Sequence, residues 1–329
     1  MRVGVDVSPL VQTRAGTARY VNGLVPELEL LPDLELRRLG FGGPGRAAAL
    51  VRDTAWYNAL LPAQARRYRL DVLHCTTFRA PLRSPVPVVI TVHDLALLRF
   101  PEFFTAWTRL YGVAALKPVL RAARRIVAVS EFTRRDVVEL VGVPPERVAV
   151  APNATSSTFR AEGARESGDY VFALGTLEPR KNLPRLIEAT RRLGVELRVV
   201  GARGWGGVEV GGTGVRWLGE LPDEEVARLY RGALCFAYPS LWEGFGMPVL
   251  EAMQCGTPVV TSAGSAMEEV AGEAAELVDP LDPGAIAAGI ERAIARRGEL
   301  VPLGLERARS YTWRAAAEAT AAVYREAAA

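Results

Sequence analysis

The chain has few cysteines and histidines and no long apolar run, and each scarcity excludes a class of protein. Its 329 residues include 3 cysteines and 2 histidines. Cys75, Cys235 and Cys255 lack any Cys-x-x-Cys spacing, which argues against a disulfide framework and a zinc site and favours a reducing cytosol. No apolar run approaches the roughly 18 residues of a membrane-spanning helix. A strand-like run from Arg2 to Val7 stands where a secretory leader would, so we expect a cytoplasmic protein.

Lysine is also scarce, and the basic residues are unevenly spread. Only Lys117 and Lys181 are lysines among the 40 basic residues, which indicates a compositional bias toward arginine. Residues 1–150 hold 21 basic residues against 13 acidic ones, whereas residues 151–329 hold 19 against 24. The basic first half suits an anionic partner, such as a phosphorylated substrate or an acidic membrane surface. A solvated arginine-rich surface explains the same excess.

Apolar strand-like runs alternate with helical patterns along the whole chain, which predicts an α/β fold with parallel sheets. With 49% hydrophobic residues, the chain can bury a core in each of two domains. The expected strands span residues 2–7, 35–41, 71–74, 86–93, 125–129, 148–151, 169–175, 195–201, 214–218, 233–238, 257–261 and 275–278. The expected helices lie near residues 16–31, 47–60, 103–123, 131–141, 182–193, 223–232, 248–255, 265–271, 283–297 and 312–329.

Residues 152–168 are rich in Ser, Thr, Gly and Ala and have no periodic apolar pattern, so they are interpreted as a linker region. We place doubly wound domains at residues 1–155 and 169–311, a linker at 156–168 and a final helix at 312–329. Such domains bind ligands at the carboxyl ends of their strands. We therefore expect a cleft between the carboxyl edges of the two sheets.

Both histidines end strand-like runs, where a side chain faces the ligand crevice of a parallel sheet. His93 follows a purely apolar run and precedes Asp94, so we favour a functional role for it; a core histidine is an equal interpretation of His74. After the first strand, Gly16 would let the backbone approach a ligand near a helix N-terminus. The Gly-x-Gly-x-x-Gly dinucleotide fingerprint is absent there.

Two adjacent cations, Arg180 and Lys181, stand between an expected strand and an expected helix. Basic residues oppose the helix dipole at an N-terminus, so their presence there indicates a bound anion. A diphosphate fits, because it gains both the cations and the positive end of the helix.

The most specific segment, Tyr238 to Val260, reads as a strand, a glycine-rich loop, a helix and a strand. Pro248 fits the first turn of the helix. Glu243 lies in the loop and Glu251 just inside the helix. The segment offers two carboxylates for sugar hydroxyls and N–H groups at a positive helix end for phosphate. Two loop glycines allow exposed backbone amides there: Gly244 and Gly246.

The spacing of Glu243 and Glu251 resembles the Glu-x7-Glu motif of the retaining family 4 glycosyltransferases, which have the GT-B fold. Within that family, the sequence is most similar to a bacterial mannosyltransferase-like branch. The resemblance implies an N-terminal Rossmann-like acceptor domain, a C-terminal Rossmann-like donor domain across a cleft, and a last helix that packs back toward the first domain. Further segments resemble the family in the expected order: Arg14–Tyr20, Thr91–Asp94, Val129–Phe132, Gly175–Asn182 and Tyr311–Trp313.

The resemblance also implies roles for single residues. Glu251 would hold the ribose hydroxyls and Glu243 the donor sugar, while His93 would lie beside that sugar at the reacting face. Arg180 and Lys181 would neutralise the diphosphate. Gly16 would approach a phosphate or the acceptor from the first domain. The loop backbone that would line the sugar and phosphates belongs to Gly244, Phe245, Gly246 and Met247.

The implied reaction moves a hexose, with retention, from a nucleoside-diphosphate sugar to a hydroxyl of a glycan, glycolipid or small molecule. GDP-mannose is the favoured donor, with UDP-glucose and dTDP-rhamnose as alternatives. No Asp-x-Asp metal motif stands in a suitable loop, so protein cations and a helix N-terminus would stabilise the leaving group, and we expect neither a metal nor a cofactor. The arginines form no nucleic-acid-binding motif with aromatic residues.

The sequence departs from the family pattern at two positions, and two other functions stay open as alternatives. Thr176 stands where many relatives carry arginine, with Arg180 as a substitute, and Ala154 replaces a usual glycine. A sugar-nucleotide 2-epimerase would place additional acids and histidines in the cleft. A non-catalytic sugar-nucleotide- or glycan-binding protein would not need His93, Arg180, Lys181 and both glutamates together.

The expected helix 103–123 and its end mix aromatic and basic side chains, which suits an interfacial helix on anionic lipid. A core-facing apolar stripe with a solvated basic face explains the mixture nearly as well. The residues concerned are Trp107, Arg109, Tyr111, Lys117, Arg121, Arg124 and Arg125.

Overall fold

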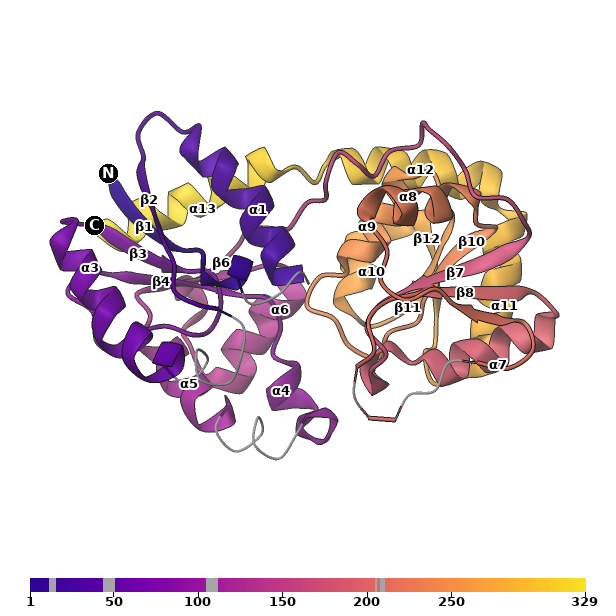
Figure 1. The fold of residues 1–329 in the computed structure, drawn as a ribbon, viewed down its shortest axis with the longest axis horizontal. Helices are drawn as coiled ribbons and strands as arrows, with labels where there is room; N and C mark the ends of the chain where they lie inside the picture. The colour runs from indigo at the N-terminus through magenta and orange to yellow at the C-terminus, as the bar shows by residue number, and fades with distance from the viewer. Residues whose placement is uncertain (12–15, 44–50, 105–111, 205, 208–210) are drawn as a thin grey trace. The chain divides into compact units, whose positions relative to one another are not determined.

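A computed structural model of the chain describes residues 1–329 except 12–15, 44–50, 105–111, 205 and 208–210 (Figure 1). The chain divides into two compact units. Unit 1 comprises Met1–Ala154 together with Thr312–Ala329, and unit 2 comprises Thr155–Tyr311. In the described part of the chain, no helix combines the length and apolarity needed to cross a membrane.

Unit 1 is built on a parallel sheet of order β2-β1-β3-β4-β5-β6. Its strands are β1 Arg2–Asp6, β2 Glu35–Leu39, β3 Val72–Cys75, β4 Val88–Val92, β5 Arg125–Ala128 and β6 Val148–Val150. Side chains alternate between the faces of a strand, and in β4 Ile90 and Val92 enter one hydrophobic cluster while Val89 enters the other. The helical segments are η1 Ser8–Val11, α1 Gly16–Glu29, η2 Arg52–Leu60, α3 Leu61–Arg67, α4 Ala96–Arg99, η3 Pro101–Phe103, α5 Val113–Ala122, α6 Glu131–Asp136, η5 Val137–Val141 and η6 Pro145–Arg147.

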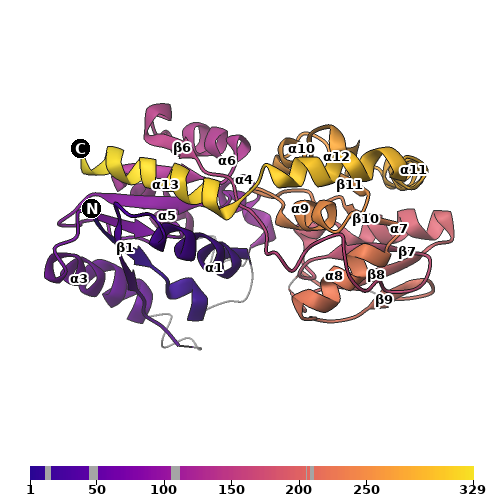
Figure 2. The same ribbon diagram turned by 90° about the horizontal axis from the view of Figure 1, so that it is seen from above.

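The last helix of the chain, α13 Trp313–Ala328, belongs to unit 1. It lies beside α1 (Figures 1 and 2) and buries Ala317 and Tyr324 in the same cluster as Val89. Thr312 caps its N-terminus, because the side-chain oxygen accepts a hydrogen bond from the Ala315 N–H at 3.1 Å. Sequence-distant elements thus share one core.

Unit 2 repeats the scheme with a parallel sheet of order β12-β11-β10-β7-β8-β9. Its strands are β7 Tyr170–Leu174, β8 Glu196–Val200, β9 Val215–Trp217, β10 Cys235–Tyr238, β11 Val259–Ser262 and β12 Ala275–Val278. Its helical segments are η7 Pro179–Lys181, α7 Leu183–Leu193, α8 Asp223–Gly232, α9 Met247–Gln254, α10 Ala266–Ala271, η8 Gly272–Ala274, α11 Pro283–Ala295 and α12 Arg297–Arg309.

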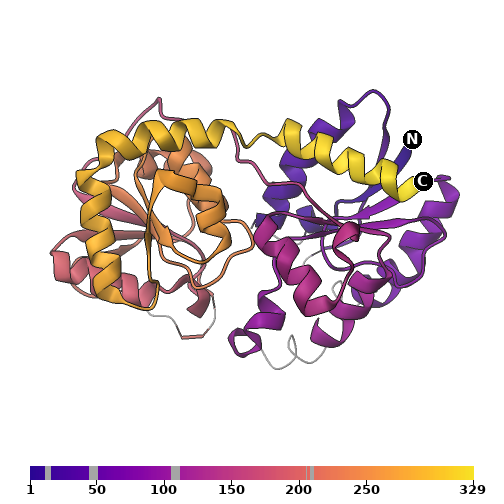
Figure 3. The same cartoon turned by 180° about the vertical axis from the view of Figure 1, so that it is seen from behind.

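The structure departs from the sequence-based helices in three places. The expected helix 283–297 ends at Ala295, and the unexpected helix α12 follows it after a sharp turn (Figure 3). Helix α12 contains Pro302, and a proline inside a helical pattern argues against a helix when only the sequence is read. Gly304 of α12 packs closely on α9, because an added Cβ would lie 3.1 Å from the Met253 side chain. Helices α3 and α4 were also missed. Residues 105–111 of the expected helix 103–123 lie outside the described residues, and α5 forms its second half.

Candidate active site

The loop between β10 and α9 carries Glu243 and depends on a glycine conformation at its end. Gly246 has a φ of 95°, a left-handed value, and an added Cβ would lie 2.7 Å from the Met267 side chain. A side chain would therefore be strained twice, by conformation and by space. Pro248 occupies the first turn of α9, where its missing N–H costs no helical hydrogen bond.

Glu243 is the centre of a buried polar cluster. Its Oε1 accepts from Lys181 Nζ at 2.7 Å, from the Tyr238 hydroxyl at 2.8 Å and from the Ser240 hydroxyl at 2.8 Å. Its Oε2 accepts from Arg180 Nη1 at 2.7 Å. Both carboxylate oxygens are thus held in place by groups from η7 and from the end of β10.

The two cations are placed by the turn that follows β7. Arg180 also donates to the Trp242 carbonyl at 2.9 Å and to Glu178 Oε1 at 2.7 Å, so its planar fork joins three acceptors. Lys181 donates to the Tyr238 hydroxyl at 2.6 Å. Its stem packs on Gly175, where an added Cβ would lie 3.1 Å from Lys181 Cε.

The charges of this cluster balance within the protein. Burial alone would raise the pKa of Glu243, but Arg180 and Lys181 outweigh it and lower the pKa to about 2. Burial lowers the pKa of Lys181, opposed by Glu243. Two carboxylates, Glu243 and Glu178, face the two cations. An anionic ligand that enters here must therefore compete with glutamate for the cations.

Glu251 lies inside α9, as the sequence indicated, and is buried. The Tyr230 hydroxyl lies 3.2 Å from both Glu251 Oε2 and the Pro248 carbonyl oxygen, so α8 and α9 are joined at this point. In the glycine-rich loop, Gly244 and Gly246 are both buried. Phe245 is buried and meets Tyr311 edge-to-face with the ring centres 5.6 Å apart, while Met247 is partly exposed.

In unit 1, His93 directly follows β4 and is partly exposed. Its Nε2 lies 2.9 Å from the Thr76 carbonyl oxygen, which can only accept, so Nε2 carries a hydrogen. Desolvation by burial lowers the pKa of His93, which favours the neutral ring with Nδ1 as an acceptor. Tyr20 packs edge-to-face on the ring with a centroid distance of 4.8 Å.

The other two candidate residues of unit 1 are His74 and Gly16. His74 is a core residue: its exposure is 0%, and both ring nitrogens have hydrogen-bond partners within the unit. Gly16 begins α1, whereas the preceding Arg14 lies outside the described residues.

The structure thus brings Arg180, Lys181 and Glu243 together, whereas the Glu251 side chain contacts Tyr230. Sequence reasoning missed two further partners of Glu243, Tyr238 and Ser240. Tyr238 ends β10 and Ser240 follows it, a position that could have marked them as ligand-facing. Within the described ranges, no group of three or more His, Cys, Asp or Glu side chains is arranged to hold a metal ion.

Comparison with known proteins decides the family. A family model described as "Glycosyltransferase Family 4" matches residues 4–158, and one described as "Glycosyl transferases group 1" matches residues 155–304. O-antigen chain mannosyltransferase B of Escherichia coli is 30% identical over 95% of this chain and 96% of its own length. The chain belongs to the family 4, group 1 glycosyltransferases. It is therefore a glycosyltransferase, as the Glu-x7-Glu resemblance predicted.

Further relatives and solved structures agree. An MMP alpha-(1->4)-mannosyltransferase of Mycolicibacterium hassiacum is 31% identical over 80% of this chain and 72% of its own length. The sucrose-phosphate synthase of Thermosynechococcus elongatus has a TM-score of 0.81 at 18% identity, covering 99% of this chain and 98% of that one. Anabaena HepE, solved with UDP and glucose, has a TM-score of 0.74 at 18% identity, covering 99% and 100%. These structures show the GT-B fold, as expected.

Proposed function

We propose that this glycosyltransferase moves a hexose, preferentially mannose, from a nucleoside-diphosphate sugar to a hydroxyl of a glycan, glycolipid or small molecule. The configuration at the anomeric carbon is retained and no metal ion takes part. The observation that carries the proposal is the cluster of Arg180, Lys181 and Glu243, which places two cations beside one fixed carboxylate. The mannosyltransferases among the relatives support the choice of sugar.

The cluster suits a donor because its cations can change partners. A diphosphate brings at least two negative charges, and a guanidinium binds phosphate oxygens bidentately. When the diphosphate takes Arg180 and Lys181, Glu243 is freed to accept hydrogen bonds from the sugar hydroxyls. The ion pairs of the ligand-free protein thereby keep the buried cations compensated until the donor arrives.

The proposed reaction breaks the bond between the anomeric carbon and the diphosphate oxygen, which keeps the electron pair. The acceptor hydroxyl forms the new bond on the same face, and its proton passes to the leaving phosphate. Arg180, Lys181 and the N-terminus of α9 stabilise the growing negative charge. Because the acceptor hydroxyl itself attacks on the same face, no covalent link between the sugar and the protein is needed, and Glu243 serves to position the sugar.

The remaining candidate residues would contact other parts of the donor, or the acceptor. Glu251 would hold the ribose hydroxyls, and the backbone from Gly244 to Met247 would line the sugar and phosphates. His93 would contact the donor sugar, with Nδ1 accepting from a hydroxyl because Nε2 is committed to Thr76. Gly16, at the start of α1, would approach the acceptor or a phosphate.

A thermal-shift screen against GDP, UDP and dTDP tests the donor. A nucleotide that binds the native state raises the melting temperature by mass action, and we expect the largest shift with GDP. UDP is the first alternative, since HepE was solved with UDP-glucose. Transfer with the matching sugar, followed by NMR of the anomeric proton, tests retention. Inversion would refute the mechanism, and the absence of any shift would refute the donor site.

The acceptor and a membrane contact remain proposals of their own. Relatives named D-inositol 3-phosphate glycosyltransferase, such as the Frankia alni protein at 30% identity, favour a phosphorylated small acceptor for the basic unit 1. Peripheral binding to anionic membrane would use the segment 103–123, of which Trp107, Arg109 and Tyr111 lie outside the described residues. Co-sedimentation with acidic and neutral vesicles at low salt tests the membrane contact. Pelleting with acidic vesicles alone would support that contact, and equal recovery in the supernatant with both would favour a soluble acceptor.

A further inference from the structure

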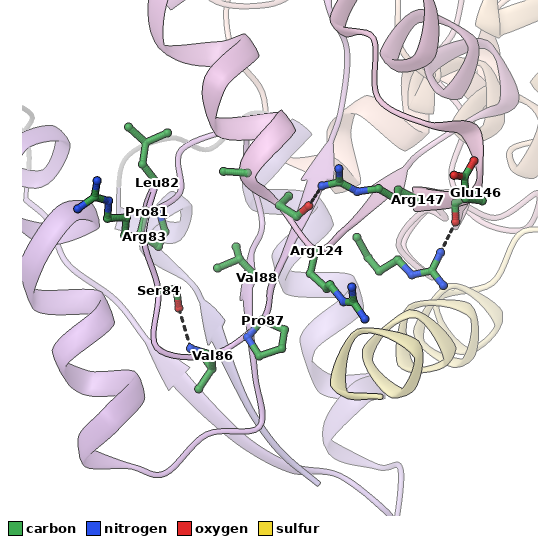
Figure 4. Close-up of a pocket in the computed structure, with 13 residues that line it drawn as sticks. Pro81, Leu82, Arg83, Ser84, Val86, Pro87, Val88, Arg124, Glu146 and Arg147 are labelled. Carbon is green, nitrogen blue, oxygen red and sulfur yellow. Dashed lines mark hydrogen bonds between the residues drawn. The ribbon is translucent and has the colours of Figure 1, made fainter.

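A pocket of about 770 Å³ opens at the amino edge of the unit 1 sheet (Figure 4). Its lining includes Val88, the first residue of β4, and Arg125, the first residue of β5. His93 follows the opposite end of β4, and the five residues of that strand span about 16 Å. The pocket is therefore separate from the sheet edge at which His93 lies.

The pocket is strongly basic. Four arginines and one carboxylate, that of Glu146, belong to its lining. The arginines are Arg83, Arg124, Arg125 and Arg147. An excess of three positive charges around one pocket is costly unless solvent or an anion compensates it.

Two of these arginines are held by the protein. Arg147 donates to the Arg121 carbonyl at 2.9 Å and to the Ala123 carbonyl, and Arg125 donates to the Glu146 carbonyl. Carbonyl oxygens satisfy N–H groups but carry no net charge. Among the described residues, Arg125 alone of the two has a carboxylate partner, Glu326 at 3.0 Å. Their guanidiniums keep unused donors, since each has five N–H groups.

The other two arginines are exposed, and their side chains make no hydrogen bond or ion pair with another described residue. Arg124 lies on the wall near Arg147, and Arg83 lies at the opposite rim (Figure 4). The lining also has apolar side chains: Leu82, which is 53% exposed, Val86 and Pro87. Charge and apolar surface thus occur in the same pocket.

We propose that this pocket binds a phosphate ester, with Arg124 and the unused N–H groups of Arg147 as anchors for the phosphate and the apolar side chains toward Arg83 as the seat of the organic part. Guanidinium groups pair with phosphate oxygens through parallel N–H bonds. The same chemistry is found in a soluble phosphorylated metabolite and in a glycerophospholipid headgroup. The site lies outside the proposed donor site and does not depend on it.

Arginine modification by phenylglyoxal, followed residue by residue with peptide mass spectrometry, tests the proposal without interference from the donor site. Glycerol 3-phosphate is expected to slow the modification of Arg124 and Arg147 but not of Arg66, an exposed arginine of α3 in the same unit. Protection by phosphatidylglycerol vesicles, but not by phosphatidylcholine vesicles or glycerol 3-phosphate, would identify a lipid source. Protection by neither probe, or equal protection of Arg66, would overturn the site.

A variant then tests whether the two arginines share one ligand. In Arg124→Gln the apparent affinity of the protecting ligand at Arg147 is expected to fall about tenfold or more, the loss of a charged hydrogen bond. The matched change Arg66→Gln is expected to leave it unaltered. Because the Arg124 side chain is exposed, the variant should fold. Unchanged protection of Arg147 in Arg124→Gln would refute a shared site.

Discussion

His74 and Tyr324, 250 residues apart, are joined by a hydrogen bond of 2.7 Å between Nδ1 and the hydroxyl oxygen. The other ring nitrogen lies 2.8 Å from Thr91 Oγ1, which in turn lies 2.9 Å from the Tyr20 hydroxyl. All four side chains are buried. The chain of contacts links β3, β4 and α1 to the last helix, so α13 is fixed on unit 1 by polar as well as apolar contacts.

Removing this histidine should destabilise the protein at neutral pH. In His74→Gln, one amide cannot reproduce both contacts, so the buried hydroxyl of Tyr324 or that of Thr91 loses a hydrogen bond, at a cost of about 1–3 kcal/mol. Denaturant unfolding at pH 7 measures the change. Equal stability of variant and wild type would show that the network contributes nothing.

The same residue should shape the pH dependence of stability. Desolvation by burial lowers the pKa of His74 to about 3, whereas a histidine in the unfolded chain titrates near 6.5. The unfolded chain therefore takes up a proton first as the pH falls, and the wild type should lose up to about 1.4 kcal/mol per pH unit between pH 6.5 and 3 from this group. Unfolding series at several pH values should show a shallower loss in His74→Gln. Parallel curves would contradict the assignment.

Lys181→Met should strongly reduce transfer. The variant removes a buried cation that would neutralise the leaving diphosphate, and such donors typically contribute about 10²–10³ in rate. Lys117→Met is the matched control, because Lys117 is the second of the chain's two lysines and lies in α5. Steady-state kinetics with a soluble acceptor give the comparison. A kcat/KM equal to that of the control would remove Lys181 from the site.

Glu251→Ala should weaken nucleotide binding. If the carboxylate holds the ribose hydroxyls, losing a charged hydrogen bond costs about 1.5–3 kcal/mol, roughly 10- to 150-fold in affinity. Calorimetry with the nucleoside diphosphate measures it, and circular dichroism confirms folding. Tyr230→Phe is a useful companion, since it removes the hydroxyl next to Glu251 and leaves the carboxylate. Unchanged affinity in folded Glu251→Ala would exclude the role.

His93→Ala should lower the transfer rate far more than the nucleotide affinity. The proposed contact is to the sugar, so its loss acts on the reacting centre, at a typical cost of ~10²–10³ in rate. The diphosphate is assigned to residues of the other unit and should bind as before. Loss of affinity with intact turnover would reverse the assignment, and no change in either would make His93 structural.

Turnover should survive removal of divalent metal ions. Arg180, Lys181 and the N-terminus of α9 are proposed to stabilise the leaving group without one. Activity after exhaustive treatment with EDTA, with and without added Mg²⁺ or Mn²⁺, is the measurement. Complete loss that either ion restores would demonstrate a metal requirement.

Much of the architecture could be predicted from the sequence, because parallel α/β units repeat a local signal. Buried strands such as Val88–Val92 are short apolar runs, and caps such as Thr312 mark helix starts. Helix α12 escaped prediction because Pro302 interrupts its pattern and its close packing through Gly304 is a tertiary contact. The candidate residues Glu243, Arg180 and Lys181 were identified from their place beside helix starts.

The sequence by itself determined the family, the two α/β halves and the positions of the charged candidates, because these are properties of local patterns and their order. Only the tertiary structure decided which charges meet. Glu243 and Lys181 are 62 residues apart and share an ion pair, and His74 proved to be a core residue through Tyr324, which no local pattern connects to it. Such pairings arise from the crossing of strands and helices distant in sequence, and burial then sets the pKa values that follow.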